Sequence, residues 1–142
     1  MLEVQEAKRW DQLPRPLEHV ADAIRSSREL LSMKDEEGQA LCSAETWERA
    51  MNFLVEQALW LLNKRDRVIQ TPDIWSGPHQ SIDLHWETPS SELLINIRAD
   101  AEQPAGFYGD DKGKLRIKGT LDLVRFNEGL LLWLEKTGDS VA

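Results

Sequence analysis

The stretch SIDLHWETPSSELLINIR, residues 81–98, decides the fold of this chain. Two runs of alternating apolar and polar residues flank the short turn 88–91. A period of two places alternate side chains on opposite faces of a sheet, so we expect strands over 81–87 and 92–98. The residues expected to share the buried face are Ile82, Leu84, Trp86, Leu93, Ile95 and Ile97.

The β region extends on both sides of this hairpin. Pro72 limits the segment before it to a sheet edge or a strand start, and residues 110–114 (DDKGK) form a turn into a strand over 115–120. Short strands joined by short turns favour an antiparallel meander over a parallel sheet. The sequence predicts a sheet of four to five strands within 68–122.

Helical patterns surround the sheet. Pro14 and Pro16 open an apolar pattern of helical spacing over 14–33, and Ser43 is a suitable N-cap for a second helix over 43–65. A third helix is expected over 125–137, packed on the apolar face of the sheet. The prediction is one α+β domain over 14–142, preceded by a flexible arm over 1–13.

The composition excludes several classes of function. The chain has 142 residues, with 25 acidic against 17 basic side chains and a net charge of -8. This charge disfavours binding to nucleic acids and to anionic membranes. The single cysteine, Cys42, allows no intrachain disulfide, and the first ten residues lack the apolar run of a signal peptide. We expect a cytoplasmic protein without a cofactor.

Asp83, His85 and Glu87 share the polar face of one predicted strand. With Tyr108 brought near by the fold, these side chains are candidates to bind a metal ion or a small molecule. The alternative is that they form cross-strand pairs on a solvated face, with partners among Asn96, Arg98, Arg116 and Lys118. No catalytic residue and no resident metal is assigned, because no motif of a known catalytic site is present.

Two helical segments are apolar in every direction. Residues 58–62 (ALWLL) and 130–134 (LLLWL) each contain five consecutive apolar residues, which one neighbouring layer cannot bury completely. An exposed apolar patch would favour a homodimer, with Trp60, Leu131, Leu132 and Trp133 in the interface. The alternative is that the two helices cover each other within one chain.

Four segments carry a resemblance to a known group of proteins: SGPHQSIDLHWE (76–87), ELLINI (92–97), FYGDD (107–111) and IKGT (117–120). Together with TWERAMNFL (46–54), they resemble a family of small bacterial proteins with the pattern PxIxxGxxGSIDLxW, LLINI, YGDD and IKG. The chain departs from that pattern at Gln80, where the family has Gly. The resemblance implies an accessory protein of the kind that mobile elements such as integron cassettes carry, and it supplies no catalytic residues.

Two functions are compatible with these features. The first is a non-enzymatic module that binds, and as an antitoxin-like protein neutralises, another protein. The second is a small-molecule or metal-binding protein or enzyme that uses Asp83, His85 and Glu87. The absence of a catalytic motif favours the first.

Overall fold

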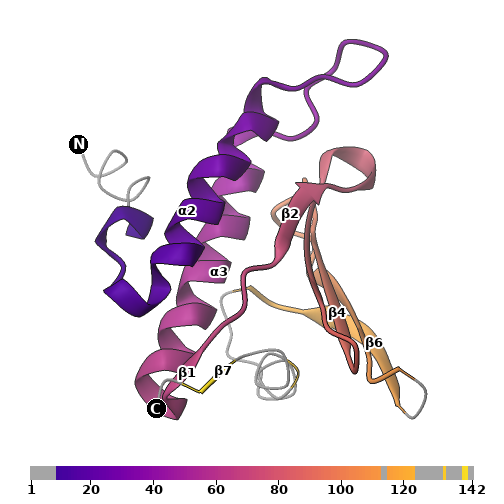
Figure 1. Cartoon of the computed structure of the whole chain (residues 1–142). Helices are drawn as coiled ribbons and strands as arrows, with labels where there is room; N and C mark the ends of the chain where they lie inside the picture. Colours follow the sequence, from indigo (N-terminus) through magenta and orange to yellow (C-terminus); the bar gives the residue numbers. More distant parts are fainter. Residues whose placement is uncertain (1–8, 113–114, 124–132, 134–138, 141–142) are drawn as a thin grey trace.

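The computed structural model describes residues 9–112, 115–123, 133 and 139–140. It has two layers, with helices on one side and an antiparallel sheet on the other (Figure 1). The α-helices are α2 (Glu18–Ser27) and α3 (Ala44–Arg65), and 3-10 turns are formed by η1 (Arg9–Gln12), η2 (Arg15–Leu17), η3 (Arg28–Ser32) and η4 (Pro78–Gln80).

The sheet confirms the predicted meander. Its five strands follow one another in chain order, each antiparallel to the next: β2 (Asp73–Ser76), β3 (Ile82–Glu87), β4 (Glu92–Ile97), β5 (Ala105–Asp110) and β6 (Arg116–Leu121). In the central pair, Leu84 lies opposite Ile95 and Trp86 opposite Leu93. The six apolar residues predicted for the inner face are each at most 1% exposed, which confirms the register.

Helix α3 covers the inner face of the sheet and contacts β3 and β4, whereas α2 packs beside α3 and contacts β2. Ser43 starts α3 as predicted, because its hydroxyl accepts a hydrogen bond from the backbone N–H of Thr46 at 3.1 Å. At the other end, Lys64 and Arg65 lie in the last turn, and Asp66 leaves the helix in the left-handed conformation. The two predicted helices before the sheet are therefore present.

The first predicted helix, 14–33, is divided into three pieces. Only α2 is α-helical, and the tighter turns η2 and η3 flank it. The buried Ser27 is the last residue of α2, and its hydroxyl donates to the carbonyl of Ile24 at 2.7 Å while it accepts from Trp47. A hydroxyl that bonds back to the preceding turn disturbs helical geometry, which fits the change to a 3-10 turn at Arg28.

The predicted arm is shorter than expected at its C-terminal end. Residues 9–12 form η1, and Trp10 is 3% exposed, with its ring in an edge contact with Trp47 at 5.2 Å. Residues 1–8 lie outside the described residues. The predicted helix 125–137 also lies outside them, apart from Trp133, which is buried against Gly109 on the inner face of the sheet.

A second, two-stranded sheet was not predicted. In it β1 (Arg67–Val68) pairs antiparallel with β7 (Asp139–Ser140) and joins the end of α3 to a segment near the C-terminus (Figure 1). Two-residue strands are too short to show a period of two in the sequence. They nevertheless bring the middle of the chain and a segment near its C-terminus together.

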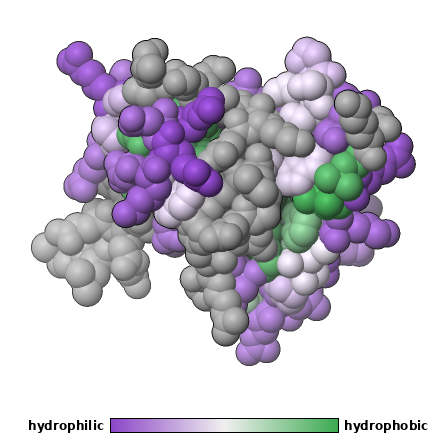
Figure 2. Space-filling model, turned by 90° about the horizontal axis from the view of Figure 1, so that it is seen from below, coloured by the Kyte–Doolittle hydropathy of each residue, from purple (hydrophilic) through white to green (hydrophobic). Residues whose placement is uncertain are grey.

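Most large apolar side chains in the described part of the chain are buried. The exposed ones among the described residues are Met33, Trp75 and Leu115, at 37%, 55% and 52% exposure. Figure 2, a view from below, shows a narrow strip of apolar surface on the side of the sheet, bordered by hydrophilic residues. Among the described residues no helix is long and apolar enough to cross a membrane.

Candidate functional site

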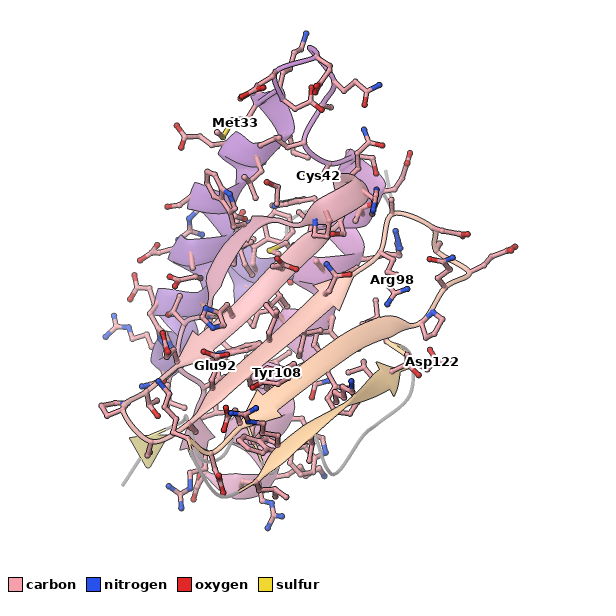
Figure 3. The ribbon with its side chains drawn as sticks, turned by 90° about the vertical axis from the view of Figure 1, so that its right-hand side faces the viewer. Met33, Cys42, Glu92, Arg98, Tyr108 and Asp122 are labelled. Atoms are coloured by element: carbon pink, nitrogen blue, oxygen red, sulfur yellow. The ribbon has the colours of Figure 1, made fainter. Side chains whose placement is uncertain are left out.

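The outer face of the five-stranded sheet is the candidate site, since none of the described elements lies over it (Figures 1 and 3). Three cross-strand rows of side chains form this face. The first contains Trp75, Asp83, Asn96 and Thr120, the second Asp73, His85, Leu94, Tyr108 and Lys118, and the third Glu87, Glu92, Asp110 and Arg116.

The centre of the face is partly apolar. Leu94 lies directly opposite both His85 and Tyr108, and all three side chains are half-buried. Trp75 on the edge strand β2 is 55% exposed. Apolar and aromatic side chains among charged ones are typical of the centre of a binding surface, whereas a merely solvated face would carry polar residues there.

Histidine and carboxylate groups converge near the β3–β4 turn. Nε2 of His85 lies 3.4 Å from Oε2 of Glu92, and the possible ligand atoms of His85, Glu87 and Glu92 all lie within 4.8 Å of one another. Nζ of Lys112 lies 2.8 Å from Oε2 of Glu87. This hydrogen bond lowers the pKa of the Glu87 carboxyl and raises the pKa of the Lys112 ammonium.

The four predicted site residues are not brought together. Asp83 accepts a hydrogen bond from Nδ2 of Asn96 at 2.8 Å, away from His85 and Glu87. Tyr108 donates to Oδ2 of Asp110 at 3.0 Å, and this bond is the main cause of the raised pKa of its phenol. Only His85 and Glu87 share a cluster, and its third member is Glu92.

Glu92 was not among the predicted site residues, although the hairpin register could have indicated it. The four-residue turn 88–91 sets the register of the hairpin, and this register puts Glu92 directly opposite Glu87. Two like charges at directly opposed positions destabilise a sheet unless a cation lies between them. In the structure Lys112 supplies this positive charge to Glu87.

The opposite end of the same face contains a cavity of about 480 Å³. The turn η4 and the loop 99–103 border it, and Asn96 and Arg98 line it at the end of β4. Figure 3 shows the position of Arg98. The residues that line the cavity are Pro78, His79, Ser81, Asn96, Arg98, Ala99, Asp100 and Gln103. No pattern in the sequence indicated this cavity, because its walls come from two loops that only the fold brings together.

The predicted interface residues lie elsewhere. Trp60 on α3 is half-buried, with the guanidinium of Arg65 5.8 Å from its ring centre. Trp133 is 4% exposed, and Leu131 and Leu132 are outside the described residues. Neither Trp60 nor Trp133 belongs to the outer face of the sheet.

No protein-family model matches the chain, and comparisons with curated proteins and with solved structures find no match. A proposal for its function therefore rests on the geometry of the outer face.

Proposed function

We propose that this chain is a protein-binding module whose contact surface is the outer face of the sheet. The observation that carries the proposal is the group of Trp75, Leu94 and Tyr108, which is exposed or half-buried on a face that no described element covers. Large apolar and aromatic groups with a charged surround are the side chains that contribute most to binding between proteins. The resemblance to accessory proteins of mobile elements supports a role in neutralising the bound partner.

The charges around this centre favour a specific partner over non-specific adhesion. Asp73, Glu87 and Glu92 lie toward β2, β3 and β4, whereas Arg116 and Lys118 lie on β6. A partner would need the opposite arrangement across its own surface, and such complementarity sets orientation and partner choice more than affinity.

Site-specific photo-crosslinking in the native host tests this proposal. A photoreactive amino acid at Leu94 is expected to give one crosslinked product of defined mass, because its side chain points out of the sheet. The same amino acid at Glu48, an exposed position on α3, is the matched control and is expected to give none. Equal products from both positions, or none from Leu94, would contradict the proposal.

Once the partner is identified, its affinity for this chain should depend on the residues at the centre of the outer face of the sheet. Tyr108→Ala removes an aromatic ring of the kind that dominates interfaces, and we expect at least about a fivefold loss of affinity. Thr120→Ala, an exposed change on the same face, should leave affinity unchanged. An unchanged affinity for Tyr108→Ala would place the interface elsewhere.

A second candidate function, binding of a divalent cation, is favoured by the convergence of His85, Glu87 and Glu92. One imidazole and two carboxylates are suitable ligands for Zn²⁺ or Mn²⁺. The Lys112 ammonium would compete with the ion, since it already contacts Glu87 at 2.8 Å. Binding to the native state alone would raise the melting temperature.

Thermal unfolding with and without Zn²⁺ tests the second candidate. Lys112→Met should enlarge the rise in melting temperature, because it removes the competing charge, and Glu92→Gln should abolish it. Asp73→Asn, which removes an exposed carboxylate outside the cluster, is the control. A rise that persists in Glu92→Gln would show that the ion binds at another site.

A further inference from the structure

The cavity at the end of the outer face has two walls that are held rigidly by hydrogen bonds. The first wall is the turn 77–81. The backbone N–H of Gly77 donates to the carbonyl of Ser81 at 2.8 Å, and the Ser81 hydroxyl donates to the carbonyl of Pro78 at 2.6 Å. The Gln80 side-chain amide ties the turn to another part of the chain, since it donates to the carbonyl of Ala40 at 3.0 Å.

The backbone of this wall is unusual. His79 and Gln80 both have positive φ, 54° and 62°, a left-handed conformation that costs free energy in residues other than glycine. Gly77 is required for a different reason, because a Cβ there would lie 2.5 Å from the Ser81 hydroxyl and 2.8 Å from the Asn96 amide. The turn is thus fixed in a strained shape that places His79 at the cavity.

The second wall is the loop 99–103. Arg49 on α3 reaches across and donates to the carbonyls of Arg98 at 2.9 Å and Ala99 at 3.1 Å. Within the loop, the Asp100 carboxylate accepts from the N–H of Glu102 at 2.9 Å, and the Asp100 carbonyl accepts from the N–H of Gln103 at 3.1 Å. A cavity with walls fixed in this way requires little ordering when a ligand enters.

The side chain of Arg98 is the one strong charge at the cavity without a partner in the described part of the chain. Its guanidinium makes no hydrogen bond and no ion pair with any described residue. It lies low over the sheet, since a Cβ on Gly106 would be 3.3 Å from Nη2. Arg98 lines the cavity, and the five N–H donors of its planar guanidinium make no hydrogen bond with a described residue.

We propose that this cavity binds a group carrying a single carboxylate, with the Arg98 guanidinium as its charged partner. Arginine binds carboxylates through two parallel hydrogen bonds, and the neighbouring His79 offers a further polar contact. Pro78 and Ala99 provide apolar wall for a small body attached to the carboxylate. The site goes beyond the protein-binding function proposed above and does not depend on it.

Charge balance favours a monoanion over a phosphate. The cavity presents one guanidinium, and the carboxylate of Asp100 lies on its border. A dianion would add a second negative charge beside Asp100, in a chain whose net charge is already -8. Arg98 and Asp100 already cancel each other, so a bound carboxylate leaves the site with one net negative charge, whereas a dianion would leave two. A carboxylate of this kind is present both in small organic acids and at the C-terminus of a peptide.

A titration of the full chain followed by ¹H–¹⁵N NMR tests the proposal. The probes are butyrate, N-acetylalanine, N-acetylalanine amide and inorganic phosphate, each at millimolar concentration. We expect both carboxylates to shift the side-chain signals of Asn96 and Arg98, and the neutral amide to shift neither. Tighter binding of N-acetylalanine than of butyrate would identify a peptide C-terminus as the source of the carboxylate, and the reverse order a free acid.

Variants complete the test. Arg98→Met should weaken carboxylate binding at least about tenfold, because it removes the charge-assisted hydrogen bonds. Lys118→Met removes an exposed charge on the same face, outside the cavity, and should leave binding unchanged. Equal binding of the acid and its amide, tighter binding of phosphate, or unchanged binding by Arg98→Met would each overturn the proposal. These outcomes do not depend on the protein-binding proposal, which the crosslink at Leu94 tests separately.

Discussion

Tyr108 is the only tyrosine of the chain, so the ionisation of one residue can be followed by the ultraviolet absorbance of tyrosinate. The hydrogen bond that its hydroxyl donates to Asp110 at 3.0 Å raises its pKa above the ordinary value of about 10. The neutral phenol is thus the form that the fold favours. This stabilisation is fully present below the ordinary pKa and is lost as the pH rises through the raised one.

We therefore expect the native chain to titrate at higher pH than the same chain unfolded in urea. Asp110→Ala removes the main cause of the shift and should bring the native midpoint down toward that of the unfolded chain. Coincident titrations of native and unfolded wild-type protein would show that the hydrogen bond between Tyr108 and Asp110 is not maintained in solution.

Ser27 is a second residue whose role can be isolated. Its hydroxyl accepts a hydrogen bond from the Trp47 indole at 2.9 Å, and both residues are buried, at 8% and 2% exposure. Ser27→Ala leaves the buried indole N–H without this acceptor, which should cost about 1–3 kcal/mol of stability. Urea unfolding measures this cost as a lower midpoint at constant slope.

The adjacent Ser26 supplies the control, because it lies on the same helix and is exposed. Ser26→Ala should change stability by less than about 0.5 kcal/mol. The double variant Ser27→Ala/Trp47→Phe should be less destabilised than the sum of its single variants, since the unsatisfied donor is then absent. A loss of stability as large in Ser26→Ala as in Ser27→Ala would show that the effect does not come from the hydrogen bond between Ser27 and Trp47.

At the scale of single elements, α3 begins at a well-defined cap. The Ser43 hydroxyl accepts from the N–H of Thr46 at 3.1 Å and satisfies one of the free donors of the first turn. Ser43→Ala should destabilise the fold by about 1 kcal/mol, whereas Ser43→Asp keeps an acceptor and adds a favourable charge at the helix start. Thermal or urea unfolding distinguishes the two, and an equal loss in both variants would contradict the capping role.

Elements that depend on a regular period could be predicted from the sequence. Ile82, Leu84 and Trp86 alternate with polar residues. Because the described elements cover only one face of this sheet, that alternation fixes strand, register and buried face together. The break after α2 could not be predicted, since the Ser27 hydroxyl that bonds back to Ile24 is also held by a hydrogen bond from the distant Trp47. The helix propensity of a residue type carries no information about a hydrogen-bond partner that is distant in the sequence.

The candidate site was predictable only in part, because some of its side chains depend on partners from other strands and loops. His85 and Glu87 follow from one strand, and Glu92 follows from the hairpin register. Asp83 was predicted to join them, but the neighbouring strand offers it the Asn96 amide. The cavity at Arg98 requires loop conformations, including positive φ at His79 and Gln80, that residue types alone do not predict.

At the scale of the whole molecule, the core and the candidate binding features lie on opposite faces of the sheet. The helices and the inner face of the sheet supply the core, with Trp86, Leu54 and Ile95 at most 1% exposed. The outer face contributes little to that core. It carries the exposed Trp75, the cluster at His85 and Arg98, which has no partner among the described residues. Changes on this face should therefore affect binding more than folding.

The predicted homodimer can be compared with the exposure of the apolar residues 58–62 on α3. The sequence favoured a homodimer through an apolar patch on residues 58–62, but Ala58 and Leu61 are buried, and Leu59, Trp60 and Leu62 are half-buried against the core. An apolar surface that one chain already covers provides little driving force for pairing. Residues 58–62 taken alone therefore favour a monomer, and the homodimer stays a prediction because residues 130–132 and 134 lie outside the described part of the chain.

We accordingly expect light scattering at micromolar concentration to give a mass near 16.3 kDa. Trp60→Glu provides the discriminating variant, because Trp60 is the predicted interface residue that α3 contributes. A mass near twice the monomer value that falls to the monomer value in folded Trp60→Glu would restore the homodimer through α3. If the larger mass fell only in Trp75→Glu, the second copy would occupy the outer face of the sheet, and the surface proposed for a partner would then serve self-association.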